Sequence, residues 1–292
     1  MKLLIACDDT TDVKGMLADL RRAGLPSGAQ AVVLSVADLL PIPFDPPPTP
    51  LPNAVRRARE RATRELDAAR RTAEAAADVL RGAFPSWSIS AEAQADAPVW
   101  AIVKKGAEWL PDLIVVGSHN HSALGRLLLG SVAQAVLTHA NRSVRIARAP
   151  AAQIDAPPRL VVGVDGSPEA AAAVARVATR RWPQGGQVRV VTALDATMIS
   201  MLELDGETDE HAAAARLAAE AAERLRAAGL DTSTAVVEGS PKRVLVEVAE
   251  GWRADCIFIG ARGLRGAERI LLGSVSASVA ARAHCSVEVV RP

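Results

Sequence analysis

The sequence contains no tyrosine, and its aromatic residues make up only 3% of 292 positions. Basic and acidic residues are nearly balanced, with 34 Lys and Arg against 33 Asp and Glu. Proteins that bind nucleic acid usually carry a basic excess, and those that bind single strands also present aromatic side chains for stacking. Both features are missing, so the composition argues against a nucleic-acid partner.

Long apolar runs are also missing. No stretch reaches the roughly 18 apolar residues of a membrane-spanning helix, and the apolar start of the chain meets an acid at Asp8, too early for a signal peptide. There are three cysteines, Cys7, Cys256 and Cys285, and none forms a Cys-x-x-Cys pair. We therefore expect a cytoplasmic protein without a membrane partner, whose thiols are buried and reduced.

An internal repeat organises the chain. LLIACDDT at 3–10 resembles LVVGVDGS at 160–167, so Asp8 aligns with Asp165, and the ends SVRIAR and SVEVVR also match. The first copy is longer because it contains LLPIPFDPPPTPLPN, residues 39–53, where seven prolines exclude helix and central strand. We place one domain at 1–150 and a second at 158–292, joined by a linker rich in proline and small residues.

Each copy alternates short apolar runs with alanine-rich helical stretches. In the second copy, the apolar runs lie at 160–165, 188–194, 234–237, 256–259 and 286–290. Continuous apolar runs of this length are typical of strands buried on both faces of a parallel sheet. The stretch SPEAAAAVARVATR predicts a helix capped by Ser167, with Pro168 in its first position. The pattern predicts an α/β fold with two tandem doubly wound parallel-sheet domains.

The fourth apolar run of the second copy leads into a frame of glycines. Gly260 and Gly263 are followed, nine residues later, by Gly273 and Ser274, which open the helix SVSASVAARAH. Ligands of open parallel sheets bind beyond the carboxyl ends of the strands, where Asp165 also lies. Glycine can adopt backbone angles closed to other residues and lets the chain approach a ligand closely. The free N–H groups of a helix start favour an anion. The frame therefore predicts an anion site.

Polar side chains around this frame fit a phosphate. Ser274 and Ser276 add hydroxyl donors, while Arg262, Arg265 and Arg269 lie between the glycines. The frame is not a P-loop, because no lysine precedes Ser274, and it is not the Gly-x-Gly-x-x-Gly turn of dinucleotide-binding folds.

Both copies resemble the universal stress protein family, arranged as a tandem pair. The second copy matches the pattern of the family's nucleotide-binding members at Asp165, Gly260, Gly263, Gly273 and Ser274. The resemblance implies five-stranded domains of the adenine-nucleotide α-hydrolase-like class, with strand order 3-2-1-4-5, that pair through their last strands. It also implies ATP as the ligand, with Mg²⁺ as a candidate companion ion. The implied contact residues are Asp165, Gly166, Ser167, Ala193, Gly239, Gly260, Arg262, Gly263, Arg269, Gly273, Ser274, Val275 and Ser276.

The first copy departs from this pattern at its ligand edge. A carboxylate roughly 8 Å from a phosphate charge costs about 2 kcal/mol at an effective dielectric of 20, so added acids oppose a nucleotide. We expect a degenerate site in the first copy and ATP in the second alone. The replacements are Asp9 for Gly166, Asp96 for Gly239, His119 for Arg262, Asn120 for Gly263, Ser122 for Arg265 and Ala133 for Ser276, whereas Arg126 matches Arg269.

Two histidines and three tryptophans also stand out in the sequence. His119 and His121 have no third ligand at a matching spacing, so we assign no metal site. Trp100, Trp109 and Trp252 lie beside apolar residues in expected helices, which favours core packing.

The sequence predicts a cytoplasmic stress-response protein that binds ATP in its C-terminal domain and acts as a nucleotide-responsive regulator or interaction module. No general base or positioned nucleophile accompanies the frame, so no catalytic residue is assigned and slow ATP hydrolysis is the most we expect. Two alternatives stay open, namely a paired scaffold without nucleotide and an ATP-dependent transferase or ligase. The two domains are expected to pair within one chain, with a homodimer as a further option.

Overall fold

The computed structural model describes residues 1–39, 53–118, 129–150, 156–196, 198–200, 209–263 and 272–292. The N-terminal half contains strands β1 (Lys2–Ala6), β2 (Gln30–Asp38), β3 (Ser88–Asp96), β4 (Leu113–Gly117) and β5 (Val144–Ala147), and helices α1 (Val13–Arg21), α2 (Asn53–Ala83), α3 (Pro98–Trp109) and α4 (Ser131–His139). The C-terminal half contains β6 (Arg159–Gly163), β7 (Gln187–Leu194), β8 (Asp231–Glu238), β9 (Cys256–Gly260) and β10 (Ser286–Val290), with α5 (Pro168–Ala178), α7 (Glu210–Ala227), α8 (Pro241–Gly251) and α9 (Ser274–Arg282).

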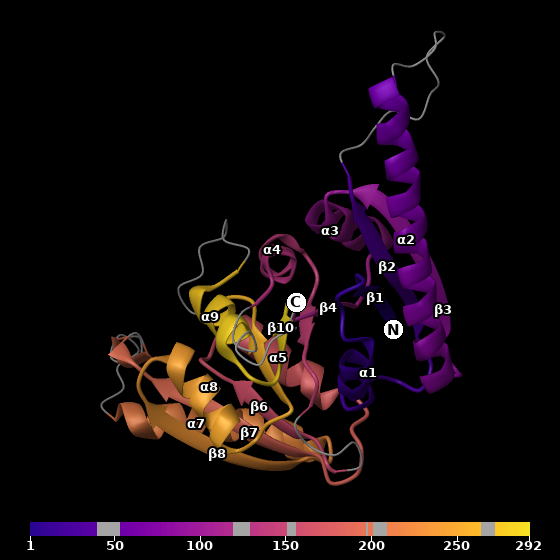
Figure 1. Ribbon diagram of the computed structural model, residues 1–292. Coiled ribbons are helices and arrows are strands. Elements are labelled where there is room, and N and C mark those ends of the chain that lie inside the picture. Colours follow the sequence, from indigo (N-terminus) through magenta and orange to yellow (C-terminus); the bar gives the residue numbers. More distant parts are fainter. Residues whose placement is uncertain (40–52, 119–128, 151–155, 197, 201–208, 264–271) are drawn as a thin grey trace.

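All of these strands belong to one ten-stranded sheet, in the order β3-β2-β1-β4-β5-β10-β9-β6-β7-β8. Within each half, neighbouring strands are parallel, and each half has the predicted 3-2-1-4-5 order. The predicted α/β fold with two doubly wound five-stranded units is therefore confirmed (Figure 1).

The helix boundaries follow local sequence signals. Ser167 caps α5 by accepting a hydrogen bond from the Ala170 N–H at 3.2 Å, and Pro168 is the first helical residue. Helix α7 ends at Ala227, and Gly229 follows with φ +86°, a left-handed angle that glycine adopts readily. Helix α2 begins at Asn53, the last residue of the proline-rich insertion, and residues 40–52 of that insertion lie outside the described residues.

The two halves meet through their last strands. β5 and β10 pair antiparallel, with Ile146 opposite Val287, Arg145 opposite Glu288 and Val144 opposite Val289. An unpaired edge strand is a liability for aggregation, and each half covers the edge of the other. The expected pairing of the halves is present within one chain.

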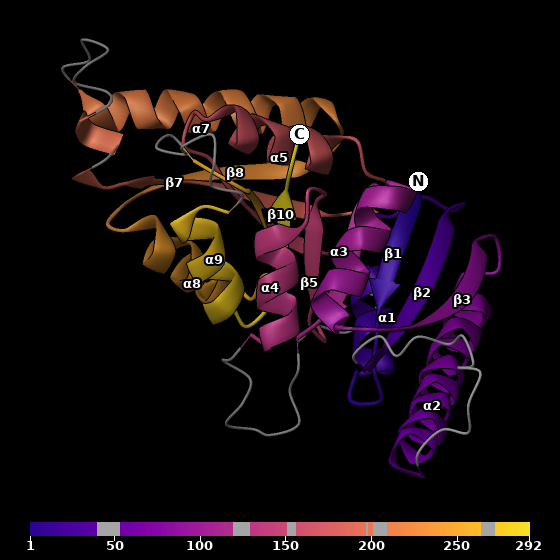
Figure 2. The same ribbon diagram turned by 90° about the horizontal axis from the view of Figure 1, so that it is seen from above.

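The helices cover the two faces of the sheet differently (Figure 2). On one face, α3, α4, α8 and α9 enclose a single apolar core that runs across both halves. On the other face, the core is split into one part under α1 and α2 and another under α5 and α7. The gap between these two parts lies over the β5–β10 seam.

Charged side chains fill that gap. Arg145 is buried on β5 and donates from Nη2 and Nε to the carboxylate of Asp19 on α1, at 2.6 and 2.7 Å. It also pairs with Glu288 on β10, at 3.1 Å, and Glu288 in turn pairs with Arg180, which follows α5. The Ser286 hydroxyl donates to Asp19 at 2.6 Å. The seam is therefore apolar on one face and ionic on the other.

One prediction about the core was wrong. Trp100 is 56% exposed, because it lies on the outer side of α3, where its ring lies near that of His139. Trp109 and Trp252 are partly buried against the continuous core, as expected.

The cysteines form no disulfide, and Cys7 and Cys256 are buried, whereas Cys285 is half-buried. Across the described ranges, none of the helices combines the length and the apolar character that crossing a membrane requires.

Candidate functional site

The carboxyl edge of β6, β7 and β8 brings together the first group of predicted site residues. The Val164 N–H donates to the Val191 carbonyl at 2.9 Å, which sets the loop after β6 beside the end of β7, where Ala193 lies. The Gly239 N–H donates to the Leu194 carbonyl at 3.1 Å and places the end of β8 next to them. Asp165, Ala193 and Gly239 therefore share one edge of the sheet.

Asp165 is held in a fixed orientation by the residues that follow it. Its Oδ1 atom accepts hydrogen bonds from the Ser167 N–H at 3.0 Å and the Ser167 hydroxyl at 2.6 Å. Gly166 makes the tight turn between them with φ +80° and is exposed. The aspartate is half-buried, with one oxygen committed to the helix cap.

The other oxygen of Asp165 faces the loop that follows β9. A Cβ atom added to Gly263 would lie 2.5 Å from Asp165 Oδ2, inside contact distance. Gly263 is therefore required for close approach of its loop to the carboxylate. This contact brings the first strand of the half and the glycine frame, almost 100 residues apart, into one site.

The frame glycines lack the unusual backbone angles that the sequence predicts, but they do allow close approach, here to neighbouring protein atoms. Neither Gly260 nor Gly263 has a positive φ; in this site that geometry occurs at Gly166 and at Gly239, whose φ is +126°. A Cβ on Gly260 would lie 2.6 Å from the Cβ of Glu169 and 2.7 Å from its carbonyl carbon. Gly260 thus lets β9 pack directly against the start of α5.

The start of α9 provides open backbone donors. Gly273 caps the helix and donates to the Ala261 carbonyl at 2.7 Å, while no side chain caps the first turn and no acidic residue lies in it. Ser274 is exposed and Val275 is half-buried, so their amides lie at the positive end of the helix dipole. An anion is the ligand that this arrangement favours.

Ser276 does not act as predicted. It is buried, and its hydroxyl donates to the carbonyls of Gly260 at 2.7 Å and Ala261 at 3.3 Å. It therefore fixes α9 to the end of β9 and does not present a donor to a ligand. The sequence carries a signal for this, because Ser276, Val279 and Ala280 share the inward face of a helix.

The cations of the site are partly paired. Arg262 forms an ion pair with Glu169 at 2.9 Å, and its side chain remains 33% exposed. Arg291, which sequence reasoning missed, follows β10, and its guanidinium donates to the Leu137 and Arg142 carbonyls at 2.6 and 3.1 Å. Burial, together with the charge of Arg262, lowers the pKa of Arg291 to about 10. Two guanidinium groups therefore repel each other beside the frame, and an anion would relieve that repulsion.

Several residues of the predicted sites lie outside the part of the chain that the structure describes. Within the described ranges, no group of three or more His, Cys, Asp or Glu side chains is arranged to hold a metal ion. Arg265 and Arg269 of the C-terminal half, and His119, Asn120, His121, Ser122 and Arg126 of the N-terminal half, lie outside the described residues.

The equivalent edge of the N-terminal half is built differently. Asp8 Oδ1 accepts hydrogen bonds from the Thr10 N–H at 3.0 Å and from the hydroxyls of Thr10 and Thr11, both at 2.8 Å. Helix α1 is capped by Asp12 and starts at Val13, two positions later than α5 does in the alignment. Because α1 starts later, its first turn does not press on the end of β4.

Acidic side chains also gather at this edge. Asp38 and Asp96 are register neighbours at the ends of β2 and β3, and Asp9 is exposed in the loop after β1. Ala133, on the inner side of α4, replaces the hydroxyl that fastens α9 in the other half. At Asp9 and Asp96 the N-terminal edge therefore carries negative charge where the C-terminal edge carries glycine, whereas Asp38 has an acidic counterpart in Asp195.

Comparison with known proteins gives matches over both halves. The model of the universal stress protein family matches residues 1–148 and 158–291. A universal stress protein of Methanocaldococcus jannaschii is 48% identical over 63 residues, which is 22% of this chain and 37% of that protein. One from Mycobacterium bovis is 31% identical over 218 residues, covering 72% of this chain and 71% of its own length.

Among solved structures, a universal stress protein from Archaeoglobus fulgidus has the same fold. The match has a TM-score of 0.63 at 20% identity and covers 99% of this chain and 96% of that one.

Proposed function

The chain belongs to the universal stress protein family, and on that premise we propose that its C-terminal half binds ATP as a regulatory ligand in a stress response. The contact between the Gly263 loop and Asp165 carries the proposal. Because Asp165 Oδ2 occupies the place of a Cβ atom at Gly263, only glycine allows this close approach. The carboxylate and the start of α9 then lie within reach of one elongated ligand.

The polarity of the site fits the two ends of an adenine nucleotide. Asp165 Oδ2 is an acceptor for an amine or a ribose hydroxyl. The amides and exposed hydroxyl of Ser274, with Arg262 nearby, are donors for phosphate oxygens. A companion Mg²⁺ would be held mainly by the phosphates and water, since the described residues offer no cluster of acidic ligands for it.

The proposal gives the two halves different roles. The C-terminal domain, 158–292, holds the nucleotide, and the N-terminal domain, 1–150, does not. The support is electrostatic: Asp9 and Asp96 lie along the edge where phosphates would have to approach, at positions where the C-terminal half has Gly166 and Gly239. Each carboxylate within roughly 8 Å adds a repulsion of about 2 kcal/mol at an effective dielectric of 20. We propose the cytoplasm as the compartment, in line with three cysteines that form no disulfide.

One observation favours a second function, a paired scaffold that binds no nucleotide. Arg262 is already paired with Glu169, and this acid lies in the first turn of α5, next to Gly260. If that ion pair persists, one cation of the site is neutralised and its partner repels phosphate.

Calorimetry on the full chain distinguishes these functions. We expect one ATP per chain and a loss of affinity of about 10-fold to 100-fold for Asp165→Ala, because a hydrogen bond to a charged group contributes roughly 1.5 to 3 kcal/mol. Asp8→Ala is the matched control in the other half and should leave the affinity unchanged. The ATP proposal fails if no heat is measured, if two equivalent sites titrate, or if Asp165→Ala binds like the parent protein.

A further inference from the structure

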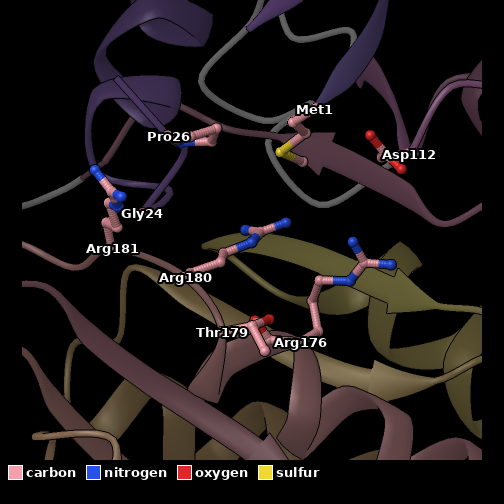
Figure 3. A pocket seen from close by; sticks show the side chains of 8 residues that line it. All are labelled: Met1, Gly24, Pro26, Asp112, Arg176, Thr179, Arg180 and Arg181. Carbon is pink, nitrogen blue, oxygen red and sulfur yellow. The ribbon is translucent and has the colours of Figure 1, made fainter. Parts of the chain in front are cut away.

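A cavity of about 290 Å³ lies at the junction of the two halves, on the face where the apolar core is split. The N-terminal half contributes the residue before β1, the loop after α1 and the start of β4, and the C-terminal half contributes the end of α5. Figure 3 shows the side chains of Arg176 and Arg180 reaching into the space beneath Met1 and Asp112. The lining residues are Met1, Gly24, Pro26, Asp112, Arg176, Thr179, Arg180 and Arg181.

The charges on this lining are unbalanced. The described residues that line the cavity include three arginines, Arg176, Arg180 and Arg181, and one acid, Asp112. Asp112 is already used, since its Oδ2 atom accepts a hydrogen bond from the Lys2 N–H at 2.7 Å. The cavity therefore has an excess of positive charge and of N–H donors.

Arg176 and Arg181 have donors to spare. Neither guanidinium makes an ion pair or a hydrogen bond within the described part of the chain. A cation in the last turn of a helix is favoured by the helix dipole, and Arg176 fits that explanation. The dipole does not explain Arg181, which lies beyond the end of α5 and is joined to the other half through its backbone N–H and the Gly24 carbonyl, at 3.0 Å.

Arg180 is buried and incompletely satisfied. Its side chain is 4% exposed; it pairs with Glu288 and donates from Nη1 to the Ala23 carbonyl at 2.8 Å, but its buried Nε–H has no acceptor. Burial is the main cause that lowers the pKa of this guanidinium, and the charge of Arg145 adds to it. Buried donors are nearly always paired in folded proteins, so an unpaired one on a basic cavity wall points to a ligand or water.

We propose that this cavity binds a small dianion, such as inorganic phosphate or a short dicarboxylate, between the two halves. The forked guanidinium group matches both kinds of oxyanion through paired N–H donors. Arg180 already bridges Glu288 on β10 and the end of α1, so a dianion there would contact both halves at once. This site is independent of the proposed nucleotide site, which lies at the other end of α5.

The test is a titration of the full chain with phosphate and, in a separate arm, with malonate, each at constant ionic strength. Binding is followed by calorimetry and by the amide resonances of Gly24 and Thr179. We expect saturable binding of at least one probe, and the arm that binds more tightly identifies the type of oxyanion. Arg176→Gln should weaken binding about 10-fold or more, and the double variant R176Q/R181Q should abolish it. Arg180 is left intact because it pairs with Glu288.

Two controls separate the cavity from other cationic surfaces. Arg224→Gln removes the same charge from the exposed face of α7 and should leave binding unchanged. Asp165→Ala should also leave it unchanged, so that loss of the nucleotide site and loss of the cavity are distinguishable. The proposal is overturned if neither probe saturates, if R176Q/R181Q binds like the parent protein, or if Arg224→Gln weakens binding as much as Arg176→Gln.

Discussion

Gly260 and Gly117 occupy equivalent positions in the two halves, and the same substitution should affect them in opposite directions. In Gly260→Ala, the new Cβ would lie 2.6 and 2.7 Å from the Cβ and carbonyl carbon of Glu169, and 3.0 Å from the Ala170 nitrogen. In Gly117→Ala, the nearest atoms are the Thr11 Cγ2 atom at 3.4 Å and the Met16 Cε atom at 3.7 Å, which are ordinary contacts.

The magnitude follows from which atoms must move. At Gly260 they belong to the backbone and to a Cβ atom, which cannot rotate away, and overpacking of this kind destabilises by about 1 to 3 kcal/mol. At Gly117 no clash arises, and replacing glycine by alanine in a strand stabilises by up to about 1 kcal/mol, mainly by restricting the unfolded chain. We expect the two variants to differ in free energy of unfolding by about 2 to 3 kcal/mol.

Urea unfolding followed by circular dichroism measures this difference, and hydrogen exchange of the α5 amides shows where the strain lies. Exchange matters because two joined halves need not unfold in one step. We expect faster exchange at the start of α5 in Gly260→Ala and unchanged exchange at α1 in Gly117→Ala. Equal stabilities within about 0.5 kcal/mol would refute the argument that close packing sets the role of Gly260.

The remaining predictions concern thiols and the seam. Burial raises the pKa of Cys7 and of Cys285 to about 12, from an ordinary 9.0. At pH 8 a thiol reagent should label the buried Cys7 and Cys256 only after unfolding. The sign of these shifts means that their contribution to stability is present below about pH 9 and is lost as the pH rises toward about 12; a urea midpoint that rises over that interval would contradict this. Glu288→Gln leaves the buried guanidinium of Arg180 without its counter-charge, while Arg145 keeps Asp19, and should destabilise by about 3 to 5 kcal/mol in urea. Glu247→Gln, in the exposed i,i+4 pair with Arg243, should change stability by no more than about 0.5 kcal/mol; similar effects of the two changes would show that burial at the seam is energetically unimportant.

Local sequence signals were sufficient to predict most of the fold. The cap at Ser167, the proline at Pro168 and the terminal Gly229 act within a few residues, so their consequences can be read from the sequence directly. The strands could be located because each is a short apolar run between helical stretches. The repeat then gave the number of units, and the family resemblance implied how they join, through their last strands.

The neighbours that require glycine in the predicted site could not be read from the sequence. A glycine in a sequence shows that something excludes a side chain, but it does not show whether the cause is a backbone angle or a neighbouring atom. At Gly263 and Gly260 the neighbours are Asp165 and Glu169, which are far from them in sequence. Arg291 and Asp19 were missed for the same reason, because their partners are more than 100 residues away.

The charged residues on one face of the seam select which strands pair, a choice that apolar side chains alone would not make. Strands β5 and β10 are both short and apolar, so either could in principle pair with a copy of itself in another chain. In the observed register Arg145 lies opposite Glu288. An equivalent β5–β5 pairing would place two arginines opposite each other, and a β10–β10 pairing would do the same with two glutamates. Like charges directly opposite one another destabilise a sheet.

Burial makes this discrimination stronger. Arg145 and Glu288 are 1% and 0% exposed, so solvent can screen neither charge, and each also depends on a partner from one particular half, Asp19 on α1 or Arg180 after α5. Replacing a buried ion pair by well-packed apolar groups is often neutral or stabilising, so these charges are poorly explained by stability alone. They are explained by specificity, because they favour the pairing of unlike halves over every pairing of like ones. Pairing of like halves would also lose the junction where α1 and α5 meet.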